Sequence, residues 1–144
     1  MPDLILITIY TDGACSPNPG PGGWAAILLA GGKEKVLSGG ERRSTNNRME
    51  LTAALKALEA IKTAHPVVIV TDSEYLKRGI SEWLPGWKKR NWQRKNGVLK
   101  NVDLWQALDK AMNRHTVSWS WVRGHAGNVL NQRADRLARQ AIPR

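Results

Sequence analysis

The apolar residues of this chain change their spacing near residue 47, and this change limits the possible folds more than any other feature. Before it, residues 4–10 are apolar almost throughout, as in a strand covered on both faces, and residues 24–30 and 35–38 indicate two further strands around Gly31-Gly32. After it, apolar residues recur every three or four positions, which predicts a helix over residues 47–63. The first part of the chain is therefore predicted to be an antiparallel meander that leads into a helix.

The second half of the chain alternates between helical and strand patterns. Strands are predicted over residues 67–70 and 117–122, and helices over 74–83, 102–114 and 130–141. Residues 16–23 and 124–127 are rich in Gly or Pro and predict loops. Two crossover strands added beside an antiparallel meander make a mixed sheet of the α/β class. With no visible linker, residues 1–144 are expected to form a single domain.

The chain is strongly basic, with 22 Lys and Arg against 12 Asp and Glu and a formal net charge of +10. A charge of this size favours a polyanionic partner, although solubility alone is an alternative reason for it. Cys15 is the only cysteine, which excludes an intramolecular disulfide and a cysteine-only zinc site. The N-terminal apolar stretch is too short for a membrane span, so we expect a soluble cytoplasmic protein with no membrane partner.

Four acidic residues stand at positions that are unusual for a surface charge. Asp12 follows the first apolar strand and Asp72 follows the strand over 67–70, each directly after a threonine. Glu50 lies in the first turn of the predicted helix over 47–63, and Asp135 lies in the last helix. Ligands of open α/β sheets bind beyond the carboxyl ends of strands, so neighbouring strands would bring Asp12 and Asp72 together. Converging carboxylates repel unless cations offset their charge, and oxygen ligands favour two Mg²⁺ ions, or Mn²⁺ in their place, over zinc.

Each acid also has a purely structural interpretation. Asp12 could open a turn, and Asp72 with the serine after it could cap the next helix. The two helical acids have possible partners on their own helices: Asn47 for Glu50 in a capping box, and Arg139 for Asp135 in an ion pair. Two acids at matching strand ends are harder to explain in this way, so the sequence favours a shared metal site.

Residues 83–95 form a basic stretch in which tryptophans are interleaved with cations. Its three tryptophans and five cations, with no acid before residue 100, are Trp83, Trp87, Lys88, Lys89, Arg90, Trp92, Arg94 and Lys95. One interpretation is a small packed helical region whose cations simply face water. The other is a surface that follows phosphates and stacks on sugars or bases, with salt-dependent affinity and no sequence preference. The concentration of charge favours nucleic acid as the partner.

Seven short motifs occur in order over essentially the whole chain, and together they are specific. They are Thr11-Asp12-Gly13-Ala14-Cys15 with the Pro- and Gly-rich segment from Asn18; Thr45-Asn46-Asn47-Arg48-Met49-Glu50-Leu51; Thr71-Asp72-Ser73; Trp87-Lys88-Lys89-Arg90; Lys100-Asn101-Val102-Asp103-Leu104-Trp105; Trp121-Val122-Arg123-Gly124-His125-Ala126-Gly127; and Asn131-Gln132-Arg133-Ala134-Asp135. In this order they resemble bacterial type 1 ribonuclease H.

The resemblance implies a ribonuclease H-like fold, a five-stranded mixed sheet (antiparallel meander plus two parallel strands) flanked by helices. It implies sequence-nonspecific, two-metal-ion hydrolysis of the RNA strand of RNA–DNA hybrids, leaving 5′-phosphate and 3′-hydroxyl ends. Asp12 would bridge both Mg²⁺ ions, Asp135 would hold the ion that activates water, and Glu50 and Asp72 would hold the other. His125 would assist proton transfer or product departure, with an incidental loop histidine as the alternative.

The resemblance also implies where the hybrid is held. Residues 83–95 would grip the DNA strand, and a wide, shallow groove with 2′-hydroxyls would identify the RNA strand. The other expected nucleic-acid contacts are Asn18 and Asn46 in the minor groove, Arg43, Thr45 and Asn101 at a DNA phosphate, and Asn47. The sequence departs from the familiar pattern at Glu74, where an amide is more usual, and at Gln132, where a further acid is common. We expect a monomer with no obligate protein partner.

Two other functions remain compatible with the residues. A catalytically silent hybrid-binding module would keep the basic surface without a working set of acids, and the presence of all four acids argues against it. Another nuclease of the same fold, acting on DNA, would need to cleave DNA substrates, and the basic stretch together with the Asn-Asn-Arg-Met-Glu motif disfavours it.

Overall fold

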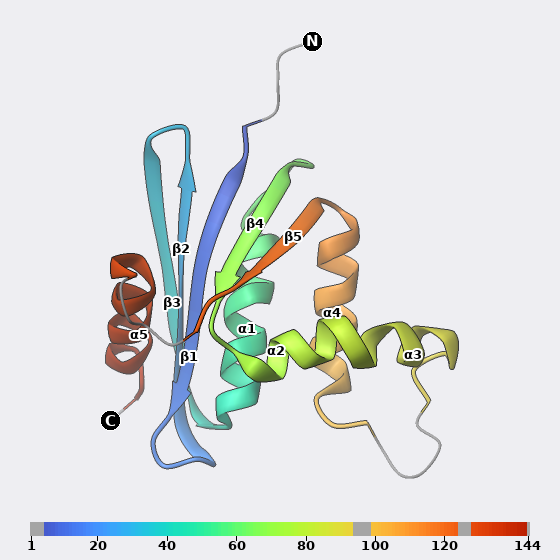
Figure 1. Cartoon of the computed structure of the whole chain (residues 1–144). Helices are drawn as coiled ribbons and strands as arrows, with labels where there is room; N and C mark the ends of the chain where they lie inside the picture. The colour runs from blue at the N-terminus through green and yellow to red at the C-terminus, as the bar shows by residue number, and fades with distance from the viewer. Residues whose placement is uncertain (1–4, 94–98, 124–127, 144) are drawn as a thin grey trace.

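Apolar strands and one charged edge strand build a mixed sheet. The computed structural model describes residues 5–93, 99–123 and 128–143, and within these ranges the sheet has five strands in the order β3-β2-β1-β4-β5. Their bounds are β1 (Ile7–Cys15), β2 (Gly20–Ala30), β3 (Lys33–Ser44), β4 (Pro66–Thr71) and β5 (Thr116–Trp121). The first three strands pair antiparallel, whereas β4 pairs parallel with both β1 and β5 (Figure 1). The predicted meander with two added parallel strands is confirmed.

Helices cover both faces of this sheet. α1 (Asn46–Glu59) packs on one face with α4 (Val102–Asn113) beside it, and α5 (Val129–Gln140) packs against β1 and β2 on the other face (Figure 1). The core between α1, α4 and the sheet includes side chains with no exposed surface, among them Ile9, Leu51, Leu58, Ile69 and Trp105. No helix within the described ranges is long and apolar enough to cross a membrane.

The segment after β4 is a continuous helical arm. It consists of α2 (Glu74–Arg78), the π-helical turn η1 (Gly79–Trp83) and α3 (Leu84–Lys89). The predicted helix over 74–83 is therefore too short. Pro85 lies in the first turn of α3, where its missing N–H removes no helical hydrogen bond, so the chain stays helical through it. Gly79 allows the arm to approach α4, because a Cβ at this position would overlap the ring of Trp105.

The strands of the meander are longer than the sequence predicts. β1 begins at Ile7 and continues past residue 10 to Cys15, because its antiparallel ladder with β2 runs to that point. The predicted loop over 16–23 is wrong from Gly20 onward for the same reason. Gly23 lies in β2 because it pairs with β1 and β3. Residue 23 must be glycine because α5 crosses there, and a Cβ would overlap the backbone of Ala138.

The bounds of β3 and α1 also differ from the prediction. β3 spans 12 residues instead of four. Its exposed, charged residues show no strand pattern in the sequence, but its backbone pairs with β2 as an edge strand. α1 ends at Glu59 rather than near residue 63, and Ala60 caps it by donating its backbone N–H to carbonyls of the last turn.

Candidate active site

Asp12 and Asp72 lie close together where two parallel strands meet. The parallel register pairs Tyr10 with Val70, and each acid lies two residues beyond its member of that pair. β4 ends at Thr71, whereas β1 continues past Asp12 because β2 still pairs with it there. The two acids therefore occupy matching positions, as the sequence predicts, although Asp12 lies within a strand rather than after it.

Glu50 reaches the same place from α1. Thr45 caps this helix, its Oγ1 accepting the backbone N–H of Arg48 at 3.1 Å, so the suggested capping box between Asn47 and Glu50 is wrong. Instead, Glu50 Oε1 accepts the backbone N–H of Gly13 at 2.9 Å. This approach requires glycine at residue 13, because a Cβ there would overlap the backbone of α1.

The carboxylates of Asp12, Glu50 and Asp72 form a group that could hold a metal ion. Each residue offers one oxygen, and these oxygens lie within 4.8 Å of one another. They open into a recess of about 470 Å³ that is also lined by Asp135 and Arg139 of α5. The structure thus brings together the four acids that the sequence singles out, each from a different segment of the chain.

Burial gives two of these carboxyl groups unusual pKa values. It raises the pKa of Asp12 to about 6, against opposing hydrogen bonds from Glu50 and the Gly13 backbone and with help from Asp135 and the charge of Asp72. Burial also raises the pKa of Glu50 well above its usual value, and the nearby charge of Asp12 adds to this effect. Glu50 Oε2 is buried and has no hydrogen-bond partner among the residues that the structure describes.

The structural interpretations of the acids are realised in part. The helix cap after β4 is Ser73, which accepts a backbone N–H of α2 at 3.1 Å, so Asp72 does not serve as the cap. Arg139 Nε donates to both carboxylate oxygens of Asp135, at 3.1 and 3.2 Å, as the helical spacing suggests. The turn suggested for Asp12 is wrong, because this residue lies inside β1. Asp135 therefore forms an ion pair on α5 and also lines the acid recess.

The chain matches a family model described as RNase H over residues 6–143. It belongs to the RNase H family. Among curated relatives named Ribonuclease H, one from Thiobacillus denitrificans is 56% identical over 138 residues, covering 95% of this chain and 93% of the relative. Another, from Bradyrhizobium diazoefficiens, is 57% identical over 143 residues, covering 99% of this chain and 93% of the relative.

Solved structures of RNase H proteins share the fold. LC9-RNase H1, described as a type 1 RNase H with the type 2 active-site motif, has a TM-score of 0.88 and 35% identity, covering 99% of this chain and 74% of that one. LC11-RNase H1, solved in complex with an RNA/DNA hybrid, has a TM-score of 0.71 and 22% identity, covering 94% of this chain and 96% of that one. The RNase H fold expected from the sequence is confirmed.

Several residues for which the RNase H resemblance implies nucleic-acid contacts line a polar pocket. The pocket has a volume of about 380 Å³, and its lining residues are Asn18, Pro19, Thr45, Asn47, Lys100 and Asn101. Asn46 lines the acid recess instead, and its backbone N–H donates to Asn18 Oδ1 at 3.1 Å. Asn47 lines both the pocket and the recess, so the two sites adjoin. Arg43 lies exposed in β3, outside this pocket lining.

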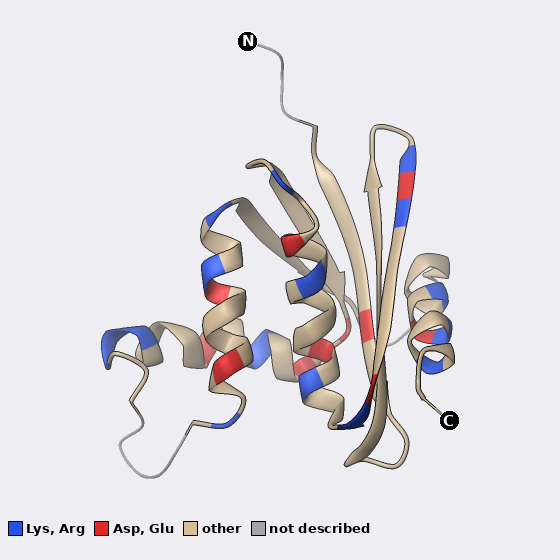
Figure 2. Cartoon of the chain, turned by 180° about the vertical axis from the view of Figure 1, so that it is seen from behind, with Lys and Arg blue, Asp and Glu red and all other residues tan. Residues whose placement is uncertain are grey.

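Within the described residues, the cations of the basic stretch lie at the end of the helical arm, away from the sheet (Figure 2). Lys88, Lys89 and Arg90 are exposed, and Lys88 forms an ion pair with Asp109 of α4 at 3.2 Å. The remaining two cations, at residues 94 and 95, lie outside the described residues. This end of the molecule therefore presents an exposed positive surface beyond α4.

The tryptophans of the same stretch pack on one another. The ring centroids of Trp83 and Trp87 are 5.9 Å apart, and those of Trp87 and Trp92 are 6.3 Å apart. Trp87 also packs edge-on against Trp105 of α4 at 5.6 Å. The packing interpretation is thus correct for the rings, yet two of them, Trp83 and Trp87, also line an apolar pocket of about 350 Å³ next to Lys100.

Two more residues, His125 and Tyr75, bear on the function of the site. His125 lies outside the described residues, so its role stays a prediction. Tyr75 lines both the acid recess and the apolar pocket, although its sequence context did not lead us to predict a role for it. The signal was its position three residues after Asp72, in the first turn of a helix that begins beside the acid.

Proposed function

We propose that the chain hydrolyses the RNA strand of RNA–DNA hybrids with two divalent metal ions held by Asp12, Glu50, Asp72 and Asp135. The enzyme class follows from the family, since ribonuclease H is an endonuclease acting on the RNA strand of RNA–DNA hybrids. The observation that carries the proposal for this site is the cluster of Asp12, Glu50 and Asp72, which each offer an oxygen within 4.8 Å of the others. Asp135 lines the same recess.

The residues of the cluster fit hard divalent cations. All the ligand atoms are oxygens, the donor set that Mg²⁺ and Mn²⁺ prefer. Glu50 Oε2 is buried without a hydrogen-bond partner within the described ranges, which a bound cation would supply. The raised pKa values of Asp12 and Glu50 show that the cluster without a cation favours protons at these positions. A divalent cation would replace those protons and satisfy the same oxygens.

In the proposed reaction, water adds to the phosphorus of the RNA backbone and the bond from phosphorus to O3′ breaks. The departing O3′ gains a proton and becomes a hydroxyl, and the phosphate stays on the 5′ side of the next nucleotide. Bound Mg²⁺, or Mn²⁺ in its place, would activate the water and stabilise the charge on the leaving oxygen. His125 is proposed to carry the proton or assist product departure, as the resemblance implies.

The chain's own residues orient the substrate in this proposal. The RNA strand lies in the acid recess, and the DNA strand reaches the polar pocket, which adjoins the recess at Asn47. Thr45 and Asn101 in that pocket take a DNA phosphate. The exposed cations Lys88, Lys89 and Arg90 follow the DNA strand further along, because contacts to phosphates give affinity without reading bases. A monomeric state and a cytoplasmic location stay predictions from the sequence.

The test is cleavage of one labelled sequence as RNA–DNA hybrid, double-stranded RNA, double-stranded DNA and single-stranded RNA, with Mg²⁺ and with EDTA. We expect cleavage of the RNA strand of the hybrid alone, and none in EDTA. Glu50→Gln should bind hybrid without cutting it, whereas Glu59→Gln, an exposed site on the same helix, should cut normally. Binding of hybrid by the wild type without cleavage would identify a silent binding module, and cleavage of DNA would identify another nuclease of this fold.

A further inference from the structure

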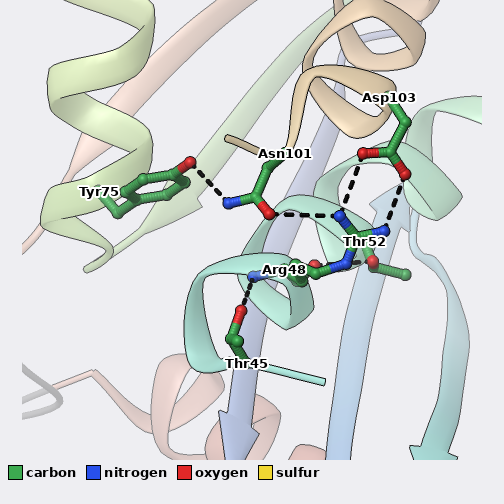
Figure 3. A network of polar contacts seen from close by, with 6 residues as sticks. All are labelled: Thr45, Arg48, Thr52, Tyr75, Asn101 and Asp103. Atoms are coloured by element: carbon green, nitrogen blue, oxygen red, sulfur yellow. Dashed lines mark hydrogen bonds and ion pairs between the residues drawn. The ribbon is translucent and has the colours of Figure 1, made fainter. Parts of the chain in front are cut away.

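A hydrogen-bond network joins the starts of α1, α2 and α4 behind the polar pocket (Figure 3). Arg48 donates to both carboxylate oxygens of Asp103, at 3.1 and 2.8 Å, and to Asn101 Oδ1 at 3.2 Å. Asn101 Nδ2 donates to the hydroxyl of Tyr75 at 2.9 Å, and that hydroxyl also accepts the indole N–H of the buried Trp105 at 3.0 Å. Asn101 thus connects a charged pair on one side with the aromatic core on the other.

The chemistry of Arg48 fixes which way the Asn101 amide points. A guanidinium can only donate hydrogen bonds, so the atom of Asn101 that faces it must be the oxygen. The amide nitrogen then points toward Tyr75, and Asn101 itself lines the polar pocket. The backbone of Asn101 has φ 59°, a left-handed conformation that asparagine tolerates better than most residues, and its side chain makes no capping bond to α4. The Asn101 side chain is therefore available for the hydrogen-bond network.

Three residues that line the polar pocket each retain a hydrogen-bond donor. Asn101 uses one amide hydrogen on Tyr75 and retains the other. Thr45 Oγ1 already accepts the backbone N–H of Arg48, so its hydroxyl hydrogen is left to donate. Lys100 adds an exposed ammonium group to the same lining. Three donors around one pocket suit a phosphate, and the direction of one of them depends on Arg48.

We infer that Arg48, Asp103 and Tyr75 are positioning residues that set the Asn101 amide for a phosphate of the hybrid's DNA strand. None of the three touches the reacting phosphorus in this scheme, and Asp103 acts through Arg48 by holding its guanidinium at two oxygens. The inference rests on the proposed function, because it assumes that the substrate is a hybrid bound in the polar pocket. It assigns a role to three residues that have none in the sequence-based prediction.

The charge of Asp103 allows a test that separates an effect of overall charge from an effect of positioning, because the two predict opposite changes in hybrid affinity. Asp103→Asn raises the net charge of a protein that binds a polyanion, so an effect through overall charge alone would tighten hybrid binding. Loss of positioning would weaken binding instead. The side chain of Asp103 is 63% exposed and that of Arg48 is 32% exposed, so loss of their ion pair should leave the protein folded.

Lys56 and Glu59 provide matched controls on α1. They form an exposed ion pair at 3.9 Å and line none of the pockets described above. The experiment measures KM and kcat for hybrid cleavage in the wild type, Asp103→Asn, Arg48→Gln, Glu59→Gln and Lys56→Gln, with a thermal melt of each. In Arg48→Gln the new amide can accept as well as donate, so it no longer dictates how Asn101 is turned.

We expect KM to rise about 10-fold in Arg48→Gln, equivalent to about 1.4 kcal/mol, and to rise by a smaller factor in Asp103→Asn. In both variants, kcat should stay within about twofold of the wild-type value, because the lost contact stabilises the bound substrate equally in the ground state and in the transition state. Each control should leave KM near the wild-type value. A KM for Asp103→Asn that is unchanged or lowered, in step with Glu59→Gln, would overturn the inference. Absence of hybrid cleavage by the wild type would instead overturn the proposed function.

Discussion

Replacing Asp12 by Asn should stabilise the protein in the absence of metal while removing its activity. The carboxyl of Asp12 is 5% exposed and has a pKa of about 6 in the folded protein, against 3.8 as its ordinary value. Between these two pH values the folded state binds more protons than the unfolded state. The free energy of unfolding therefore falls as pH rises from about 4 to about 6, and it stays at the lower value at higher pH. Asparagine has nearly the same shape, can still accept the Gly13 N–H at Oδ1 and carries no charge to be lost.

The size of the effect follows from the pKa difference. A rise from 3.8 to about 6 corresponds to about 3 kcal/mol, which is the stability that ionised Asp12 costs the folded protein at pH 7. Asp12→Asn should recover up to that amount at pH 7 and almost none at pH 3, where the wild-type carboxyl is protonated in both states. Relief of the neighbouring Glu50, whose raised pKa owes part of its shift to Asp12, acts in the same direction.

The assay is urea unfolding in EDTA at pH values from 3 to 8, for wild type, Asp12→Asn and Asp103→Asn. Asp103 is the control of opposite sign, because its ion pair with Arg48 lowers the pKa of its carboxyl, so its removal should destabilise the protein at neutral pH. Hybrid cleavage by Asp12→Asn in Mg²⁺ should fall by about 100-fold or more, since one of the proposed metal-binding carboxylates is lost. The reasoning is refuted if Asp12→Asn is no more stable than wild type at pH 7, or if its stability keeps the wild-type dependence on pH.

Two further predictions concern binding and proton transfer. Changing Lys88, Lys89 and Arg90 together to Ala should weaken hybrid binding and make the plot of log affinity against log salt shallower by up to about 2.7, because each phosphate contact contributes about 0.9; an unchanged slope would mean that these cations do not contact phosphates. His125→Ala should slow turnover with hybrid affinity retained, as measured by kcat and Kd on the same substrate. A loss of affinity at unchanged turnover would assign His125 to binding instead of chemistry.

The meeting of Asp12 and Asp72 was predictable because it depends only on strand register. Both follow a threonine at the end of an apolar run, and parallel strands bring such ends to one edge of a sheet. The pairing of Tyr10 with Val70 then sets the acids at matching positions. Periodicity also located α1 and α5, because α5 buries one face and the large apolar residues of α1 recur every three or four positions.

The strand bounds were not predictable, because backbone pairing decided them. The exposed residues of β3 show no alternation of apolar and polar side chains, and the Gly-rich start of β2 has the composition of a loop. Both segments become strands by pairing with a neighbour that is already in place. The helical arm was underestimated for a related reason, since a proline that usually ends a helix lies in the first turn of α3.

Glu50 shows how contact between distant segments determines the chemistry of a residue. From the helix alone, Glu50 could be explained as part of the helix cap, but Thr45 caps the helix instead. Its actual partner is the Gly13 N–H, 37 positions earlier, and the contact exists because residue 13 lacks a side chain. That approach carries Glu50 out of water and beside Asp12. Burial and the nearby charge of Asp12 raise the pKa of Glu50, and its Oε2 is buried without a hydrogen-bond partner within the described ranges. The glycine after the first acid therefore decides whether the acid on α1 is a surface charge or a buried member of the acid cluster.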